Sequence, residues 1–165
     1  MEASDRQFIL DLLASHNVMT LATVRPDGWP QATTVAYAND GLTLYFACDP
    51  DGQKVANIRL NDKVSATIDR DYADWNRIRG LSLGGTASVV TDPDERRHAQ
   101  DLLRRKFPQW AEMPEPEDPA LIAFVKVVPR VCSLLDYTKG YGYTLSLIHI
   151  SEPTRLLSIS YAVFC

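Results

Sequence analysis

Hydrophobic positions with helical spacing and with strand spacing alternate along the chain. Residues 4–15 carry an apolar helical face, and Ser4 with Gln7 has the form of a capping box at the start of that helix. Apolar runs typical of strands follow at 18–24, 29–38 and 42–48. The turn sequences between these runs are short, so we expect an antiparallel meander.

A break that contains proline and glycine, residues 49–52, precedes the next pair of elements. Residues 53–60 are expected to form a short helix with Val55, Ile58 and Leu60 facing inward. Residues 64–69 alternate between apolar and polar side chains, which predicts a half-buried strand.

Three further elements complete the predicted fold. A strand at 81–90 contains Gly84-Gly85, which indicates a bulge or the close approach of another backbone. Asp92 followed by Pro93 is a strong helix start, and that helix should reach residue 107. Residues 109–119 are expected to form a surface loop, and the last strand spans 121–128 with an extension at 131–135.

Six mostly antiparallel strands with short helices between them predict a mainly β (α+β) fold, a six-stranded antiparallel split β-barrel with peripheral helices. Closure into a barrel removes the exposed strand edges that a small sheet otherwise has to protect. The length of 165 residues, with 45% hydrophobic and 23% charged residues, suits one domain with a real core. We expect residues 1–144 to form this domain.

Charge and cysteine usage limit the function classes. The net charge of −4 gives no basic footprint for nucleic acid, and no long apolar run near the N-terminus indicates a signal peptide or membrane span. Cys48, Cys132 and Cys165 lack CxxC or metal-ligand spacing, and we expect Cys48 and Cys132 to be reduced, as in a cytoplasmic protein. His16 and His98 are isolated and expected on helix surfaces, so no metal site or hydrolase is predicted.

Residues 145–165 resemble the conceptual translation of a transposon-type sequencing-library adapter. Adapter codons encode 145–155 and 159–165, and an index-like spacer at 156–158 separates the two parts. The alternative is a genuine apolar C-terminal strand, for which the composition is suitable. We expect a non-native, adapter-derived tail, so no functional argument uses His149 or Cys165.

The first candidate site lies in the run YFACDPDGQKVAN, residues 45–57, where a strand ends, a loop follows and a helix begins. Lys54 is in the first turn of that helix, whose free N–H groups and positive dipole end favour an anion. The alternative is a solvated lysine on a surface helix. The residues alone therefore predict an anion site of moderate specificity.

The order of strands and turns, followed by this loop and its lysine-bearing helix, resembles the FMN-binding split barrels of the pyridoxamine 5'-phosphate oxidase-like family. The resemblance extends through LATVRPDGWPQATTVAY, DYADWNRIRGLSLGGTASVV and VVPRVCSLLDYTKGYGY, so it covers nearly all of residues 5–144. It implies FMN as the cofactor, with Lys54 on the flavin phosphate and Gln53 where the family has an arginine. It implies Ala47 and Cys48 beside the ribityl-phosphate end. The residues implied at the isoalloxazine ring are Thr33, Thr34, Val35 and Ala36.

The sequence departs from the true oxidases at two places. Gly80 stands near the position of their flavin-contacting glutamine, and up to Thr144 the chain lacks their C-terminal tryptophan and Arg/His set. Pyridoxamine-phosphate oxidation is therefore not predicted. The broader resemblance implies an FMN-dependent oxidoreductase acting on a small molecule, and no catalytic acid–base residue can be named.

Two further groups of residues are implied by the resemblance alone. A loop like 72–78 lies near the flavin pocket and the dimer interface in the family, so Trp75 would stack on the ring and Arg79 would contact a phosphate. Residues 136–142 resemble a segment that closes the pocket, with Lys139 near the flavin phosphate of the partner subunit. The alternatives are a Trp75 that only anchors its loop, with its arginines in solvent, and a flexible glycine-rich terminus.

The resemblance also implies a homodimer with flavin at its interface. Three hypotheses about function stay open: an FMN-dependent oxidoreductase, a non-catalytic flavin-binding or stress-related module, and the same barrel with deazaflavin F420 or haem as its ligand. The two histidines before residue 145 lie outside the predicted pocket, which counts against haem. Neither nucleic acid nor a membrane is expected as a partner.

The adapter interpretation is tested on DNA. We expect a genomic clone to encode this sequence up to Thr144 and different residues beyond it. A clone that encodes residues 145–165 in the same frame would contradict the interpretation and make the segment native.

Overall fold

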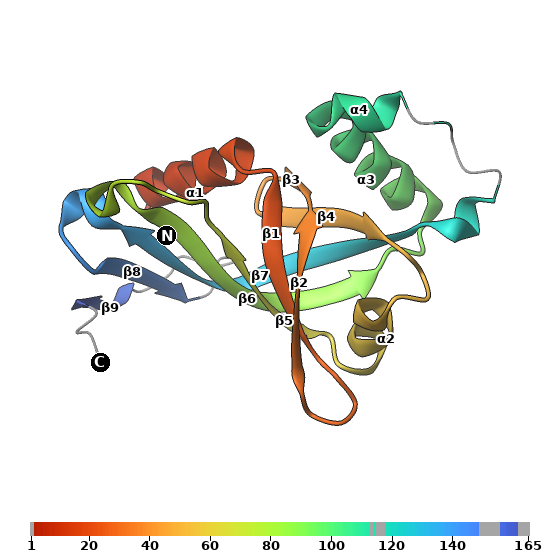
Figure 1. The fold of residues 1–165 in the computed structure, drawn as a ribbon, viewed down its shortest axis with the longest axis horizontal. Helices are drawn as coiled ribbons and strands as arrows, with labels where there is room; N and C mark the ends of the chain where they lie inside the picture. The colour runs from red at the N-terminus through yellow and green to blue at the C-terminus, as the bar shows by residue number, and fades with distance from the viewer. Residues whose placement is uncertain (1, 113, 115–117, 149–155, 162–165) are drawn as a thin grey trace.

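Alternating apolar residues curl one antiparallel sheet into a barrel, with helices around it (Figure 1). The computed structural model describes residues 2–112, 114, 118–148 and 156–161. The strands are β1 (Val18–Val24), β2 (Pro30–Ala36), β3 (Ala38–Asp40), β4 (Thr43–Cys48), β5 (Lys63–Ile68), β6 (Arg79–Val89), β7 (Ala123–Asp136), β8 (Tyr143–Ile148) and β9 (Leu156–Tyr161). The helices are α1 (Ala3–Ser15), α2 (Gln53–Leu60), α3 (Pro93–Lys106) and α4 (Pro108–Ala111), with single 3-10 turns η1 (Trp75–Arg77), η2 (Pro119–Leu121) and η3 (Tyr137–Lys139).

The barrel closes because one strand changes its partner. The sheet order is β2-β1-β5-β6-β7-β4-β3, so β2 and β3 lie at its two ends. Only Tyr37 separates β2 from β3, and the two form one bent strand that pairs first with β1 and then with β4. With β2 and β3 counted together, this path has six strands, and β8 and β9 lie off it, so the predicted six-stranded antiparallel split barrel is confirmed.

Inward side chains of β1, β2, β4, β5, β6, β7 and β8 fill the barrel interior, with α1 across its opening. Ile9 and Leu13 of α1 are at most 1% exposed and pack into the same core as the strands. Strand residues that are at most 2% exposed include Met19, Leu21, Leu44, Phe46, Ile68, Leu83, Val125 and Val127. This alternation of buried and exposed positions gives each strand an inner and an outer face.

Tyr37, at the bend between β2 and β3, connects the barrel to α1 and α3. Its side chain is fully buried, and its hydroxyl donates to Leu13 O at 3.0 Å. Lys106, at the end of α3, lies 4.0 Å from the centre of the Tyr37 ring and donates to Leu13 O and His16 O at 3.0 and 2.7 Å. Burial lowers the pKa of Lys106 to about 8. One lysine thus caps the last carbonyls of α1 at the closure point.

The predicted start of α3 is confirmed. Asp92 is the N-cap residue, and its carboxylate accepts from Glu95 N at 2.8 Å with Pro93 in the first turn. Ala99 and Leu103 of α3 then pack in a second apolar cluster against the outer face of the sheet, which includes Phe124.

Two helix predictions were wrong in detail. Helix α1 begins at Ala3 with Glu2 at its cap, so Ser4 lies inside the first turn and forms no capping box. Leu60 is 71% exposed. It follows the buried Ile58 by two residues, which turns it about 200° around the helix and away from the core.

Two further expectations were also wrong. His16 is buried because its ring folds back over the end of α1, where Nδ1 lies 2.8 Å from Leu12 O. The segment predicted as a loop from residue 109 begins with the short helix α4. Trp110 of α4 stacks on Phe124 with 6.1 Å between the ring centres, which holds the helix against the second cluster.

Strand β7 has two partners along one of its edges. Its first half, from Ala123, pairs with β4, and its second half pairs with β8. Leu145 on β8 is 6% exposed and packs in the main core. A free strand edge accepts an apolar segment of either origin, so the adapter-derived tail at 145–165 stays a prediction.

Strand β6 has a bulge at Gly84-Gly85, where it pairs with β7, as the sequence predicts. The register shifts between the two glycines, and Pro129 lies opposite Gly85, where a missing N–H donor is tolerated. A Cβ atom at Gly85 would lie 2.3 Å from Val128 O, whereas one at Gly84 would lie 3.0 Å from a methyl group of Val131.

We therefore expect Gly85→Ala to lower the free energy of unfolding by about 2–3 kcal/mol, because the β7 backbone has to move. Chemical denaturation measures this change. Gly84→Ala is the matched control, with less than half that effect, because a side-chain methyl can shift. Equal stability of Gly85→Ala and the parent protein would contradict the close approach.

Candidate functional site

The loop between β4 and α2 presents the start of a helix. Gly52 N donates to Asp49 O at 3.1 Å, and Asp51 N donates to Asp49 Oδ1 at 2.9 Å, so the loop is tightly turned before Gln53. Within the described part of the chain, no side chain caps the N-terminus of α2. The first N–H groups of α2 and the positive end of its dipole can therefore receive an anion.

Lys54, the second residue of α2, lies near the end of β4. Burial raises the pKa of the Cys48 thiol, and the nearby Lys54 charge partly offsets this rise. Cys48 packs against the main core, whereas the preceding Ala47 packs against the second cluster. The structure thus brings Lys54 together with Cys48, and it turns the side chain of Ala47 to the other face of β4.

The predicted ring-binding residues divide between the two faces of β2. Thr33 and Val35 lie opposite Leu21 and Met19 of β1, which face the core. Val35 is buried and Thr33 is half-buried, while the side chains of Thr34 and Ala36 are exposed on the outer face. Side chains of all four residues therefore cannot contact one face of a ligand.

A row of hydroxyl side chains crosses the outer face of the sheet. Register pairs Thr34 with Thr20, Thr20 with Thr67, Thr67 with Ser82, and Ser82 with Ser133. We call these five residues the hydroxyl row. Adjacent strands lie about 4.8 Å apart, so the row extends nearly 20 Å from β2 to β7.

A cavity of about 460 Å³ lies over the β5–β7 part of the hydroxyl row. Thr67, Ser82 and Ser133 line it together with Trp75 and Arg79. Its volume falls in the range of small-molecule sites. The cavity and the exposed side chains of Thr34 and Ala36 therefore share the outer face of one sheet.

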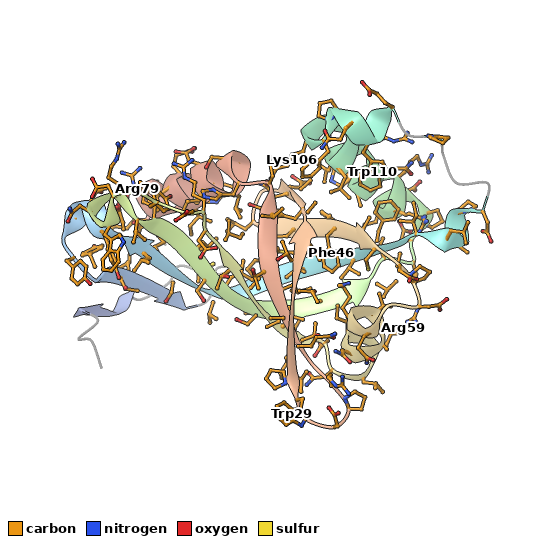
Figure 2. All side chains as sticks on the ribbon, in the orientation of Figure 1. Trp29, Phe46, Arg59, Arg79, Lys106 and Trp110 are labelled. Atoms are coloured by element: carbon orange, nitrogen blue, oxygen red, sulfur yellow. The ribbon has the colours of Figure 1, made fainter. Side chains whose placement is uncertain are left out.

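The second group of predicted residues gathers around η1 and η3. Trp75 is 64% exposed on η1. Arg79 Nε lies 3.3 Å from Asp136 Oδ1, and Lys139 Nζ lies 5.3 Å from the centre of the Tyr143 ring. Figure 2 shows Arg79 at the opposite end of the molecule from α2, which carries the labelled Arg59. The predicted residues outside β2 thus form two groups. The α2 group is Ala47, Cys48, Gln53 and Lys54, and the η1–η3 group is Trp75, Arg79 and Lys139.

A buried polar network connects α2 to the β1–β2 hairpin. Asn57 is fully buried, and its amide donates to Thr23 Oγ1 at 2.9 Å and to Gln31 Oε1 at 3.0 Å. Gln53 Nε2 donates to Asn57 Oδ1 at 2.9 Å. Gln53, a predicted phosphate contact, thus also links the first turn of α2 to the two strands.

The described residues supply few other reactive groups. They contain no cluster of three or more His, Cys, Asp or Glu side chains placed to hold a metal ion. His98 lies on α3, where Nε2 is 3.0 Å from Asp40 Oδ2. Among the helices described, none has the length and apolarity needed to span a bilayer.

Comparison with known proteins places the fold. The sequence profile of the family described as pyridoxamine 5'-phosphate oxidase matches residues 6–135. The chain belongs to the pyridoxamine 5'-phosphate oxidase family. No curated protein sequence matches it significantly. The family match includes the α2 group, Trp75 and Arg79, and it ends before Lys139 and the predicted tail.

The descriptions of solved structures similar to this family member do not agree on a function. A conserved hypothetical protein from Mycobacterium tuberculosis is 26% identical, with 84% of this chain and 87% of that chain covered and a TM-score of 0.69. A protein from Listeria innocua, provisionally named a pyridoxamine 5'-phosphate oxidase, is 25% identical, with coverage of 79% and 98% and a TM-score of 0.66. A haem-binding protein from Mycobacterium smegmatis is 19% identical, with coverage of 90% and 59% and a TM-score of 0.73, and it shares the fold.

Sequence reasoning missed Asn57, Thr23 and Gln31 in this family member. The only signal was an asparagine four residues after Gln53, on a short helix with two inward apolar residues. Side chains four residues apart on a helix are neighbours, so the Gln53–Asn57 bond could have been expected. The partners on β1 and β2 required the tertiary structure.

The position of Lys54 is testable through Cys48. We expect slow alkylation of Cys48 by iodoacetamide at neutral pH, because burial raises the pKa of the thiol and only the thiolate reacts. Lys54→Ala should slow it by a further factor of about two to five, because the charge that lowers this pKa is lost. Peptide mass spectrometry measures the rate at Cys48 alone. Lys63→Ala, at the exposed start of β5, is the control, and an unchanged rate in Lys54→Ala would refute the influence of the Lys54 charge on Cys48.

Proposed function

We propose that the chain binds FMN and acts as an FMN-dependent oxidoreductase on a small molecule. The observation that carries the proposal is Lys54, beside Cys48, at the open N-terminus of α2 in a member of the pyridoxamine 5'-phosphate oxidase family. Flavins are common cofactors in this family. Bound FMN would supply the redox chemistry, while the chain binds and orients it.

The α2 group fits the phosphate end of FMN. Open N–H groups at a helix start and one lysine suit a single phosphate. The exposed carboxylates of Asp49 and Asp51 lie in the preceding loop and oppose an anion, so binding depends on the open N–H groups and on Lys54. Gln53 contributes an amide where the family has an arginine, so Lys54 supplies the positive side-chain charge for the phosphate.

The ring of the flavin is proposed to lie along the outer face of β2. There Thr34 and Ala36 present their side chains, and Thr33 and Val35 contribute through their backbone groups. The hydroxyl row continues from Thr34 across the same face and offers hydrogen-bonding groups to a polar ring edge or a bound substrate.

A two-fold homodimer would complete this site. The α2 group and the η1–η3 group lie at opposite ends of one protomer (Figure 2), so a second copy could place its Trp75, Arg79 and Lys139 next to a flavin held by Lys54. Exposed apolar side chains on β1 and at the turn of the β1–β2 hairpin would be covered in such a dimer. They are Val18, Val24 and Trp29, which are 46%, 38% and 71% exposed.

The proposed compartment is the cytoplasm. Cys48 and Cys132 are free thiols in the described structure. Burial raises the pKa of Cys132 to about 12, which keeps its thiol protonated and unreactive. Free thiols in a barrel of this size suit a reducing environment.

The other two hypotheses predict a protein with a different absorbance spectrum or without turnover. A flavin-storage or stress-related module would bind FMN at the same place without an acceptor. The haem-binding relative from Mycobacterium smegmatis gives haem a precedent in this fold. Here, however, His16 at the end of α1 is bonded to Leu12 O, and His98 on α3 is bonded to Asp40, so neither bond involves a residue of the two groups.

The absorbance spectrum of the full chain, taken after incubation with FMN and gel filtration, tests the proposal. We expect a retained flavin spectrum on a dimer. Lys54→Ala should weaken FMN binding about ten- to a hundredfold, because a charge-assisted contact with phosphate is lost. Lys63→Ala is the matched control and should bind like the parent.

Turnover separates the enzyme from the storage protein. Rapid reoxidation of the reduced, bound flavin by one class of acceptor supports an oxidoreductase, and slow reoxidation by all of them supports storage. A folded protein that retains no flavin would refute the FMN proposal. The same preparation would then be scanned with F420 and with haem.

A further inference from the structure

The amide of Asn57 occupies an unusual position for a polar group. It is fully buried, yet both of its N–H groups and its oxygen have partners, and these come from three different elements. Thr23 on β1 and Gln31 on β2 lie directly opposite each other in the strand register, and Asn57 Nδ2 bridges this pair. A buried amide is costly unless it is satisfied, so the arrangement holds α2 in one position against the hairpin.

The third hydrogen bond extends the network to the phosphate end. Gln53 is the first residue of α2, and its side-chain amide is directed along the helix to Asn57 Oδ1. This bond fixes the first turn, which carries Lys54, relative to β1 and β2. No side chain caps the first N–H groups of α2, so they stay open to an anion.

Asn57 cannot itself contact a ligand. Asn57 is 0% exposed and Thr23 is 2% exposed, so both act only by fixing the position of α2 against the β1–β2 hairpin. Gln31 is half-buried and lies on the inner side of β2, two residues before Thr33. The network therefore connects the phosphate-binding end of the site with the strand proposed to carry the ring.

We propose that Asn57 is a positioning residue that sets the preference of this site for a phosphorylated flavin. This inference depends on the proposed function, because it assumes that Lys54 and the start of α2 receive the FMN phosphate. The amide fixes the distance between that phosphate position and β2. Without it, α2 can shift on the hairpin, and the phosphate contact is lost while the ring contacts on β2 remain.

The test compares the affinities of the full chain for FMN and for riboflavin, which lacks the phosphate, by quenching of flavin fluorescence. The readout is the dissociation constant for riboflavin divided by the dissociation constant for FMN. Asn57→Leu keeps the approximate size of the side chain and removes its hydrogen bonds. We expect the ratio to fall about tenfold toward that of Lys54→Ala, chiefly through weaker FMN binding.

Two further variants make the result specific. In Asn57→Leu combined with Lys54→Ala, the ratio should fall no further than in Lys54→Ala alone, because both changes remove the same phosphate contact. Thr23→Val removes one partner of the amide at a buried position and should lower the ratio by about threefold. If Asn57→Leu does not fold, as judged by its thermal unfolding, Thr23→Val decides the question.

Asn39→Ala serves as the control. Asn39 is half-buried and makes one side-chain hydrogen bond, to Gly41 O at 3.0 Å, in the turn between β3 and β4. Asn39→Ala also loses a side-chain hydrogen bond, so it should lower the free energy of unfolding as the Asn57 and Thr23 variants do. It should leave the ratio of the two dissociation constants unchanged.

The outcomes separate the two proposals. A parent protein that binds neither flavin refutes the proposed function and this inference together. A parent that prefers FMN, with the same preference in Asn57→Leu and Thr23→Val, refutes the inference alone. Equal weakening of both flavins in these variants would show a general structural role and would also refute it.

Discussion

The change of partner at Tyr37 is the constraint on which the rest of this structure depends. An open sheet of these strands would leave β1 and β4 with free edges, and the bent β2–β3 strand pairs with both. The bend is held from outside the sheet, where the Tyr37 hydroxyl and Lys106 both reach the last turn of α1. Helices α1 and α3 are therefore part of the closure, and the position of β2 against α2 follows from it.

The candidate site lies at a part of the closed barrel where polar side chains, and not apolar ones, are buried. Beside the end of β1, the core gives way to the buried amide of Asn57, which is bonded to Thr23 and Gln31. An apolar side chain there would pack α2 equally well but would fix its rotation less closely, because hydrogen bonds are directional and apolar contacts are not. The barrel makes the site rigid, and the polar network fixes the rotation of α2 against the β1–β2 hairpin.

Local chemistry made much of the fold predictable. Asp92 before Pro93 gives a helix start that needs no tertiary information, and Gly84-Gly85 indicated the bulge because only glycine tolerates that approach. The failures have the opposite origin. His16 was expected in solvent because the sequence does not show that its ring folds back over the end of α1. The burial of Asn57 was missed because two of its partners are more than twenty residues away. For the site, the sequence located Lys54 and its helix, but it could not show how β2 divides its side chains.

That division has an evolutionary consequence. Strand β2 is a wall one residue thick, with Val35 in the core on one side and Thr34 on the outer face on the other. A change of volume in the core beneath β2 moves the backbone that carries the outer side chains, because protein interiors are close-packed and transmit strain. New ligand preferences among related proteins can therefore arise from substitutions of residues that do not contact the ligand. Relatives with different ligands would then differ in the barrel interior as well as at its surface.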